Sequence, residues 1–365
     1  MCAAPATDAE AWLSLSLIRG VPPQALRRLL AAFGAPEAVL AAGSTALARE
    51  VAPQVARAIA RGADRAAVDA ALDWLGGAGN HVVTLADGDY PRALLEIADP
   101  PPLLYLKGRR ELLNRPALAV VGSRNATAQG VDNAEHFAHV LSNAGLTIVS
   151  GLALGIDAAA HRGGLRGVGS SIALVGTGLD IVYPARNRAL AQTLAESGAL
   201  ISEFPLGTRA LGSNFPRRNR LISGMSRGCL VVEAAISSGS LITARAAVEQ
   251  GRDVFAIPGS IHSALSKGCH ALIKQGAKLV ESAQDVLEEL GLAAAPAAAG
   301  VGPPEVAVDG AAQMLLEQLG FDPCDLDTLC RRSGLAADAV MTLLLQLELA
   351  GRVAPLAGGR YQRRR

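Results

Sequence analysis

The stretch ALAVVGSRNATAQG, residues 117–130, has the pattern of a buried strand, a polar turn and the start of a helix. Its first six residues are a continuous apolar run, and Thr127 is a residue type that caps helices. Six more runs of this kind follow: LTIVSG (146–151), SSIALVG (170–176), ALISEF (199–204), CLVVEA (229–234), DVFAIPG (253–259) and AKLVES (277–282). Because the runs are continuous rather than alternating, we expect strands that are covered on both faces.

Helical segments separate these strands. AEHFAHVLSNAG, NRALAQTLAESG and ITARAAVEQG each have apolar residues at helical spacing and end in glycine, as helix C-caps often do. Strands that alternate with helices predict an α/β fold, with a doubly wound, Rossmann-like parallel sheet over residues 81–292.

Two smaller domains are predicted on either side of the sheet. Residues 1–80 form a helical module, in which LIRGVPPQALRRLL resembles a helix-hairpin-helix or SAM-like unit. Pro22 and Pro23 fill its turn and lack the N–H groups that such hairpins offer to DNA, which favours packing over DNA contact. Residues 293–308 are an Ala/Gly/Pro linker. Residues 309–365, with three helices and a hairpin, are typical of a winged helix.

Composition places few limits on function. The net charge is +1, so any surface for a polyanion must be local, and aromatic residues make up only 3 %. Five dispersed cysteines suggest reduced thiols and a cytoplasmic protein. The N-terminus lacks the pattern of a secretory signal, and no apolar run is long enough to span a membrane.

The turns after the strands are the expected ligand site, because doubly wound sheets bind ligands at their carboxyl edge. The turn after the first strand carries Ser123, Arg124 and Asn125, where a helix N-terminus and a guanidinium favour an anion. Later turns add Gly151 and Gly155, which permit close backbone approach, and a polar loop of Ser238, Gly239 and Ser240.

Asp157 and His161, four residues apart, share one helical face. They are either half of a metal site or a hydrogen-bonded brace for the loop, and two ligands alone favour the brace.

NFPRRNRLISG, residues 214–224, concentrates positive charge in Arg217, Arg218 and Arg220. No acidic residue occurs between Glu203 and Glu233, which favours an external polyanion over internal ion pairs or a solvated face. A string of phosphates suits several anion sites along one edge. Phe215 is expected either to stack on a base or to pack under the following helix.

Motifs for other chemistries are missing. Gly176 and Gly178 are not followed by the third glycine of a dinucleotide-binding loop, and no GxxxxGK[ST] occurs. There is no nucleophile–histidine–acid set and no metal cluster. We therefore expect no cofactor, no metal and no enzymatic activity.

Seven ordered motifs resemble the DprA (Smf) family of DNA-processing proteins. They are VVGSRNAT, SGLALGIDAAAH, GTGLDIVYPARN, SEFPLGT, NFPRRNRLISG, VVEAAISSGSLITARAAVEQGRDVFAIPG and SKGCHALIKQGAKLV. The resemblance covers roughly residues 103–290 and is very specific.

The resemblance implies a protein that binds single-stranded DNA in natural transformation. Family members protect incoming DNA, load the recombinase RecA onto it in place of single-strand binding protein, and form homodimers through the Rossmann-like domain. The family's DNA pocket falls on Gly122, Ser123 and Arg124 and on Arg218, Asn219 and Arg220. Some members have a DNA-contacting lysine where this chain has Gly212, which leaves that contact in doubt.

Two other functions are open at this point. The first is a phosphoribohydrolase with the same type of sheet. The PGGxGTxxE motif of those enzymes is absent from this chain, in which Glu233 precedes the comparable loop. A transcriptional regulator is the other. The helix at 336–350 that would enter a DNA groove has no lysine or arginine, which favours protein docking instead, while the tail GRYQRRR suits weak, sequence-blind DNA contact.

Overall fold

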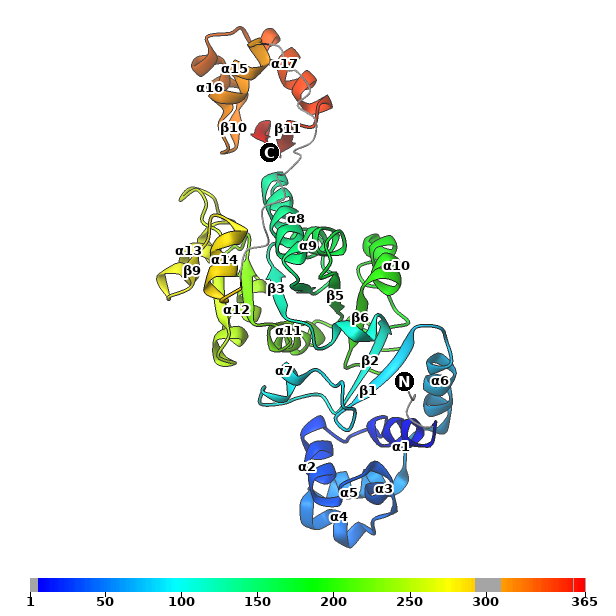
Figure 1. Cartoon of the computed structure of the whole chain (residues 1–365). Coiled ribbons are helices and arrows are strands. Elements are labelled where there is room, and N and C mark those ends of the chain that lie inside the picture. The colour runs from blue at the N-terminus through cyan, green and yellow to red at the C-terminus, as the bar shows by residue number, and fades with distance from the viewer. Residues whose placement is uncertain (1–5, 293–309, 357, 365) are drawn as a thin grey trace.

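A nine-stranded sheet forms the centre of the computed structural model, which describes residues 6–292, 310–356 and 358–364 (Figure 1). Its strand order is β1-β2-β6-β5-β4-β3-β7-β8-β9. The strands are β1 (Asn80–Thr84), β2 (Leu103–Gly108), β3 (Ala117–Val121), β4 (Thr147–Ser150), β5 (Ser171–Leu174), β6 (Ala199–Ser202), β7 (Gly228–Val231), β8 (Asp253–Ala256) and β9 (Lys278–Leu279). All seven predicted strands are confirmed and pair in parallel, while the antiparallel β1 and β2 were not predicted.

The direction of winding reverses at β3. The chain runs outward through β4, β5 and β6, then returns to place β7 on the other side of β3 and continues through β8 to β9. In open α/β sheets, ligands bind outside the carboxyl ends of the strands at this reversal. The β3–β7 neighbours therefore mark the expected site.

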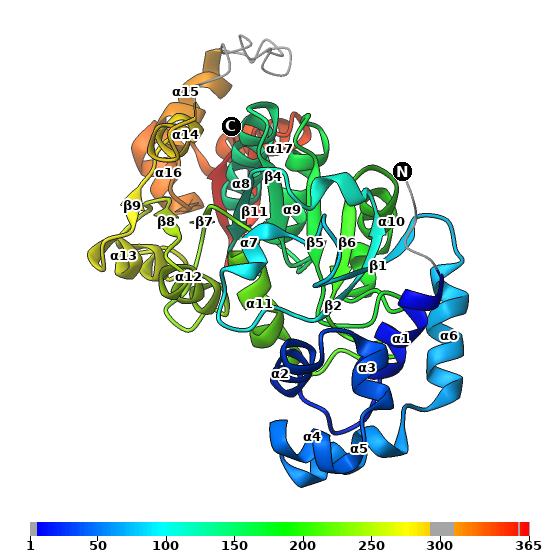
Figure 2. The ribbon, with the colours of Figure 1, turned by 60° about the horizontal axis from the view of Figure 1, so that its bottom comes forward.

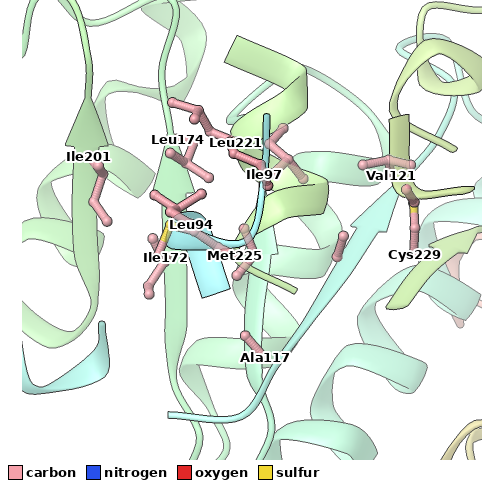
Figure 3. Packing of buried hydrophobic residues seen from close by; sticks show 14 of the residues in the cluster. Leu94, Ile97, Ala117, Val121, Ile172, Leu174, Ile201, Leu221, Met225 and Cys229 are labelled. Atoms are coloured by element: carbon pink, nitrogen blue, oxygen red, sulfur yellow. The ribbon is translucent and has the colours of Figure 1, made fainter. Parts of the chain in front are cut away.

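Helices cover both faces of the sheet, which confirms the doubly wound fold. One face packs against α8 (Ala128–Asn143), α9 (Ile156–Leu165), α10 (Arg188–Ser197) and α14 (Ala283–Glu289). The other packs against α7 (Arg92–Leu95), α11 (Asn214–Gly224), α12 (Ser240–Glu249) and α13 (Lys267–Lys274). Figure 3 shows Leu221 of α11, Met225 directly after this helix, and Leu94 and Ile97 beside the apolar side chains of the strands.

Strand β3 shows why its sequence is continuously apolar. Ala117, Ala119 and Val121 belong to the core under α11 and α12, whereas Leu118 and Val120 belong to the core under α8 and α9. Side chains alternate between the faces of a strand, and here both faces are buried. Burying each larger apolar side chain contributes about 1.5–3 kcal/mol.

The N-terminal module lies at the β1–β2 edge (Figure 2). It consists of α1 (Ala6–Ser16), α2 (Pro23–Phe33), α3 (Pro36–Ala41), α4 (Ser44–Glu50), α5 (Pro53–Arg61) and α6 (Arg65–Leu75). Trp12 and Leu13 pack with Leu103 and Tyr105 of β2. Pro22 is the N-cap of α2, so this helix starts without a side-chain cap. DNA contact by the hairpin stays a prediction.

The C-terminal residues form a winged helix, as predicted. It contains α15 (Gly310–Leu319), α16 (Leu326–Ser333) and α17 (Ala337–Leu349), with a small sheet of β10 (Cys324–Asp325), β11 (Val353–Leu356) and β12 (Arg360–Arg363). The predicted linker at 293–308 lies outside the described residues. Within the described ranges, no helix is both long and apolar enough to span a membrane.

Candidate nucleic-acid interface

An open pocket of about 650 Å³ lies beyond the carboxyl ends of β3 and β7. The loop after β3, the first turns of α11 and the loop between β7 and α12 form its walls. The structure brings ten of the predicted residues together here: Gly122, Ser123, Arg124, Asn125, Phe215, Arg218, Asn219, Ser238, Gly239 and Ser240. The other four, Gly151, Gly155, Arg217 and Arg220, do not line it.

The turn after β3 presents Arg124 and Asn125 to solvent while Ser123 is buried. The Asn125 backbone N–H donates to the Ser123 hydroxyl at 3.1 Å, which closes the turn. The Arg124 guanidinium lies 5.6 Å from the centre of the Phe215 ring and forms no ion pair with the described part of the chain. It is an exposed cation on a fixed turn.

Gly155 shapes this turn from behind rather than lining the pocket. Its φ is +73°, and a Cβ there would lie 2.3 Å from the Ser123 carbonyl oxygen and 2.7 Å from that of Arg124. The Ile156 N–H donates to the same Ser123 oxygen at 3.1 Å. A glycine is needed because only a bare backbone fits against the turn.

Asp157 and His161 brace the loop after β4. The Asp157 carboxylate accepts hydrogen bonds from the N–H groups of Gly151 and Ala153 at 3.1 and 3.3 Å. His161 Nε2 accepts from the Leu152 N–H at 3.3 Å, and Nδ1 lies 2.7 Å from the Ser171 hydroxyl. Burial lowers the pKa of His161 to about 3, so the imidazole is neutral. The brace interpretation is confirmed, and no metal-binding cluster occurs among the described residues.

Arg218 is a buried cation beneath the pocket. Its side chain donates to the carbonyl oxygens of Gly151, at 2.6 Å, and Leu174. A Cβ on Gly151 would lie 2.8 Å from this guanidinium, so Gly151 provides space for Arg218. Burial lowers the pKa of Arg218 to about 10, which still leaves it charged at neutral pH. The nearby Asp157 carboxylate, which also lines the pocket, opposes part of this charge.

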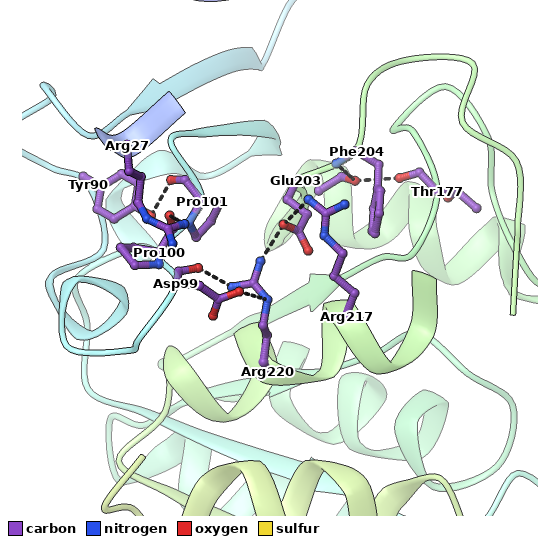
Figure 4. Close-up of polar contacts among 11 residues, drawn as sticks. Arg27, Tyr90, Asp99, Pro100, Pro101, Thr177, Glu203, Phe204, Arg217 and Arg220 are labelled. Carbon is purple, nitrogen blue, oxygen red and sulfur yellow. Dashed lines mark hydrogen bonds and ion pairs between the residues drawn. The ribbon is translucent and has the colours of Figure 1, made fainter. Parts of the chain in front are cut away.

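Arg217 and Arg220 correct the expectation of unpaired positive charge (Figure 4). Both donate to one oxygen of Glu203, at 2.9 and 2.6 Å, and the Glu203 side chain is only 1 % exposed. Arg220 also pairs with Asp99, with Nε 3.2 Å from a carboxylate oxygen. These acids come from the loops after β6 and before β2, so the acid-free interval around the arginines did not reveal them.

The helix N-terminus after β3 is a second correction, because the anion there belongs to the chain itself. The N–H and hydroxyl of Thr127 donate to the Glu233 carboxylate at 2.9 and 2.6 Å. A Cβ on Gly130 would lie 2.4 Å from the Glu233 carboxyl carbon, so the helix start is filled. Glu233 does not line the pocket, and this arrangement does not favour the phosphoribohydrolase alternative.

The loop between β7 and α12 supplies the polar wall opposite Arg124. The hydroxyls of Ser238 and Ser240 lie 2.7 Å apart, and Ser240 begins α12. The Asn219 side-chain amide lies 3.5 Å from the Gly239 carbonyl oxygen, which ties this loop to α11. The first N–H groups of α12, together with these hydroxyls, can donate to an anion in the pocket.

Phe215 forms a third wall of the pocket, and its side chain is only partly exposed. Arg124 and Arg218 lie 5.6 and 5.9 Å from its ring centre, and the Tyr183 ring is 5.7 Å away. Tyr183 belongs to the family motif GTGLDIVYPARN but was not predicted to be a site residue. Gly212, the departure from the family's lysine, lies on the pocket wall with nothing within 4 Å of a Cβ built there.

The third helix of the winged helix has no lysine or arginine with which to read a DNA groove. This helix, α17, exposes Met341, Leu345 and Leu349, the last by 82 %. In the tail, Arg364 forms two hydrogen bonds with Asp132 of α8, at 2.6 and 2.9 Å. Protein docking by this domain and DNA contact by its tail stay predictions.

Fold and site together define a Rossmann-like protein with a polar, arginine-lined pocket at its switch point and an appended winged helix. Comparison with known families is more specific. The model of the DNA recombination-mediator protein A family matches residues 81–291, and that of the DprA winged helix domain matches residues 293–359. The chain belongs to this family, as the resemblance predicted.

Individual relatives support the assignment of the chain to this family. The chain is 44 % identical to protein Smf of Escherichia coli over 304 residues, 82 % of this chain and 81 % of that one. It is 51 % identical to the DNA processing protein DprA of Streptococcus pneumoniae over 206 residues, covering 56 % and 73 %.

The structure is similar to solved structures of DNA-processing proteins. The X-ray structure of DprA from Streptococcus pneumoniae has a TM-score of 0.68 at 39 % identity and covers 79 % of this chain and 99 % of that one. DNA processing protein A of Helicobacter pylori, whose single-stranded DNA binding mode has been determined, has a TM-score of 0.53 at 30 % identity, covering 57 % and 95 %.

Proposed function

We propose that this protein binds single-stranded DNA in the β3–β7 pocket and acts in natural transformation. The observation that carries the proposal is Arg124, an exposed cation on a rigid turn, which faces a serine loop and a helix N-terminus across an open pocket. Positive charge and backbone N–H groups bind phosphates whatever the base sequence. Helicobacter pylori DNA processing protein A, a similar structure, binds single-stranded DNA.

The burial and hydrogen bonding of the pocket carboxylate favour a binding role over catalysis. Asp157 is the carboxylate among the described pocket residues, and it is buried and bonded to the Gly151 and Ala153 N–H groups. A general acid or base must reach its substrate, and this carboxylate braces a loop instead. We therefore propose a non-enzymatic protein that needs no cofactor.

The proposed DNA role extends to partners that the family resemblance implies. The protein protects incoming strands in the cytoplasm and loads RecA onto them, displacing single-strand binding protein. It forms homodimers through the Rossmann-like domain, whose last strand, β9, is a short sheet edge with Leu279 45 % exposed. RecA ATPase activity on DNA coated with single-strand binding protein tests the loading, and sedimentation tests the dimer.

Fluorescence anisotropy with matched single- and double-stranded oligonucleotides tests DNA binding. We expect a preference for the single strand and a loss of affinity with salt. Arg124→Ala should cost roughly 1.5–3 kcal/mol if it loses a charged hydrogen bond. It should also make the slope of log K against log salt shallower by about 0.7 for one lost phosphate contact.

Arg57→Ala is the matched control, because Arg57 is an exposed arginine on α5 of the N-terminal module. Its affinity and salt slope should equal those of the wild type. Equal affinity of the wild type for both DNA forms, or an Arg124→Ala variant that binds like Arg57→Ala, would contradict the proposal.

A further inference from the structure

A second cavity, of about 180 Å³, lies between the N-terminal module and the central sheet, and we call it the module cavity. The end of α1, the start of α2, the loop before β2, the loop after β6 and α11 form its walls. Among the described residues, none lines both this cavity and the β3–β7 pocket. One water molecule occupies about 30 Å³ of liquid, so the module cavity has room for a compound with one small ring.

Two buried side chains that line the module cavity each carry a polar atom without a partner. Tyr105 is 1 % exposed, and so is the side chain of Glu203. Within the described part of the chain, the Tyr105 hydroxyl and Glu203 Oε1 form no hydrogen bond. Burying a polar group without a partner costs free energy, and such groups are rare in folded proteins. A ligand in the module cavity can supply the missing hydrogen bonds.

Glu203 and Arg217 place a hydrogen-bond acceptor and a donor side by side in the cavity wall (Figure 4). Arg217 and Arg220 both donate to Glu203 Oε2, which leaves Oε1 free to accept from a ligand. The Arg217 side chain is 43 % exposed, and a guanidinium has five N–H donors, so it can also donate to a ligand. An acceptor beside a donor is complementary to an adjacent N–H and C=O pair, which is the edge of a lactam.

The charges of the wall favour a neutral ligand. An ammonium group would lie beside the Arg217 guanidinium, and a carboxylate would lie beside the Glu203 carboxylate. The rest of the wall is mostly apolar and can cover the faces of a flat ring, as in other small-molecule sites that combine apolar walls with a few polar groups. The apolar residues are Val21, Pro23, Leu26, Pro101, Pro102, Leu103 and Pro205.

The proline-rich loop before β2 holds its side of the module cavity in place. The Tyr90 hydroxyl donates to the Pro101 carbonyl oxygen at 2.8 Å (Figure 4). Arg27 of α2 donates to the Pro100 carbonyl oxygen at 3.1 Å, which ties the loop to the N-terminal module. A wall that is formed before the ligand arrives lowers the entropy cost of binding.

We propose that the module cavity binds a neutral, single-ring lactam, the chemistry of a free pyrimidine base such as uracil. Glu203 Oε1 accepts from the ring N–H, Arg217 donates to the adjacent C=O, and the Tyr105 hydroxyl bonds a second polar group of the ring. The ligand contacts both the N-terminal module and the sheet, so its binding stabilises the docked module. The proposal does not depend on DNA binding, because the β3–β7 pocket is a different site.

Saturation-transfer difference NMR of the full-length chain with uracil tests the proposal. Uracil should give a saturable signal that a saturating single-stranded oligonucleotide does not displace. 1,3-Dimethyluracil has the same ring without an N–H, and it should bind about 5- to 150-fold more weakly, the range for leaving a buried acceptor unpaired.

Three variants locate the bound ring. Tyr105→Phe removes only the unpartnered hydroxyl and should weaken uracil binding by about 2- to 12-fold, the range for one hydrogen bond, while the protein stays folded. Val21→Phe fills the module cavity from the module side and should abolish binding. Tyr105 also borders an open hollow of about 730 Å³ beside α6, so Ala67→Phe, which fills that hollow, is the matched control and should bind like wild type.

Uracil binding that is lost in Val21→Phe, weakened in Tyr105→Phe and kept in Ala67→Phe supports the proposal. Absence of a saturable signal would show that the cavity holds solvent only and would overturn it. Equal binding of uracil and 1,3-dimethyluracil would overturn recognition of the lactam edge. Displacement of uracil by DNA, with Tyr105→Phe unchanged, would assign the signal to the β3–β7 pocket, which overturns this inference and leaves the proposed function intact.

Discussion

Replacing Glu203 by glutamine is the sharpest test of how the arginine cluster is used. The substitution keeps the shape of the side chain and removes the buried charge that Arg217 and Arg220 share. The Arg220 side chain is 15 % exposed and would keep only Asp99, which is itself 40 % exposed. Stability should therefore fall, whereas DNA affinity should change less than twofold, because none of these residues lines the pocket.

The size of the loss follows from burial. Removing one partner of a buried pair costs about 3–5 kcal/mol, because the other charge is left uncompensated. Arg220 retains Asp99 and its hydrogen bond to the Asp99 carbonyl oxygen, which places Glu203→Gln nearer the lower limit, at about 3 kcal/mol. The Arg217 side chain is 43 % exposed and adds about 0–1 kcal/mol at most.

Urea denaturation followed by far-UV circular dichroism measures the change in the free energy of unfolding. Glu10→Gln is the matched control, because Glu10 pairs with Arg65 at 2.6 Å while both side chains are exposed, and its cost should be about 0–1 kcal/mol. A double-mutant cycle with Arg220→Met isolates the coupling between Glu203 and Arg220. A loss below about 1 kcal/mol, no larger than the control, would refute the argument that this carboxylate neutralises the cluster.

Three further predictions concern the loops that build the pocket. Gly155→Ala should lower the free energy of unfolding by about 3 kcal/mol or more and weaken DNA binding. Gly207 has a similar φ of +77° but lies in open space, so Gly207→Ala should lower it by only about 1 kcal/mol. Equal losses of the two variants in urea denaturation would show that the clash with the turn is relieved. His161 has a folded pKa of about 3 against 6.5 unfolded, so its contribution is complete above pH 6.5 and is lost as the pH falls. Between pH 7 and 5 the wild type should lose about 2 kcal/mol more than His161→Gln in urea denaturation, and parallel profiles would contradict this. Gly212→Lys adds a cation on the pocket wall. It should tighten single-strand binding by about 1 kcal/mol and make the slope of log K against log salt steeper by about 0.7, whereas Gly212→Gln should change neither. Anisotropy that finds both variants alike would argue against a phosphate at this position.

Local patterns were sufficient for the parallel part of the sheet and for its double winding, but not for the antiparallel strands β1 and β2. Continuous apolar runs such as ALAVVG and CLVVEA specify parallel strands, and the alternation with helices specifies double winding. Because ligands of such sheets bind at the carboxyl edge, the turn at Arg124 and the loop at Ser238 could be selected from the sequence alone.

Tertiary structure decided which charges are free. Arg217 and Arg220 looked unpaired because their acids, Glu203 and Asp99, are 17 and 121 residues from Arg220 along the chain and meet it only through the sheet order. Glu233 fills the α8 N-terminus for the same reason, across 106 residues. Secondary structure follows from short-range periodicity, which a sequence displays directly. Ion pairing depends on which distant loops the folded sheet brings together, and burial then decides whether a cation such as Arg124 remains exposed to bind a ligand.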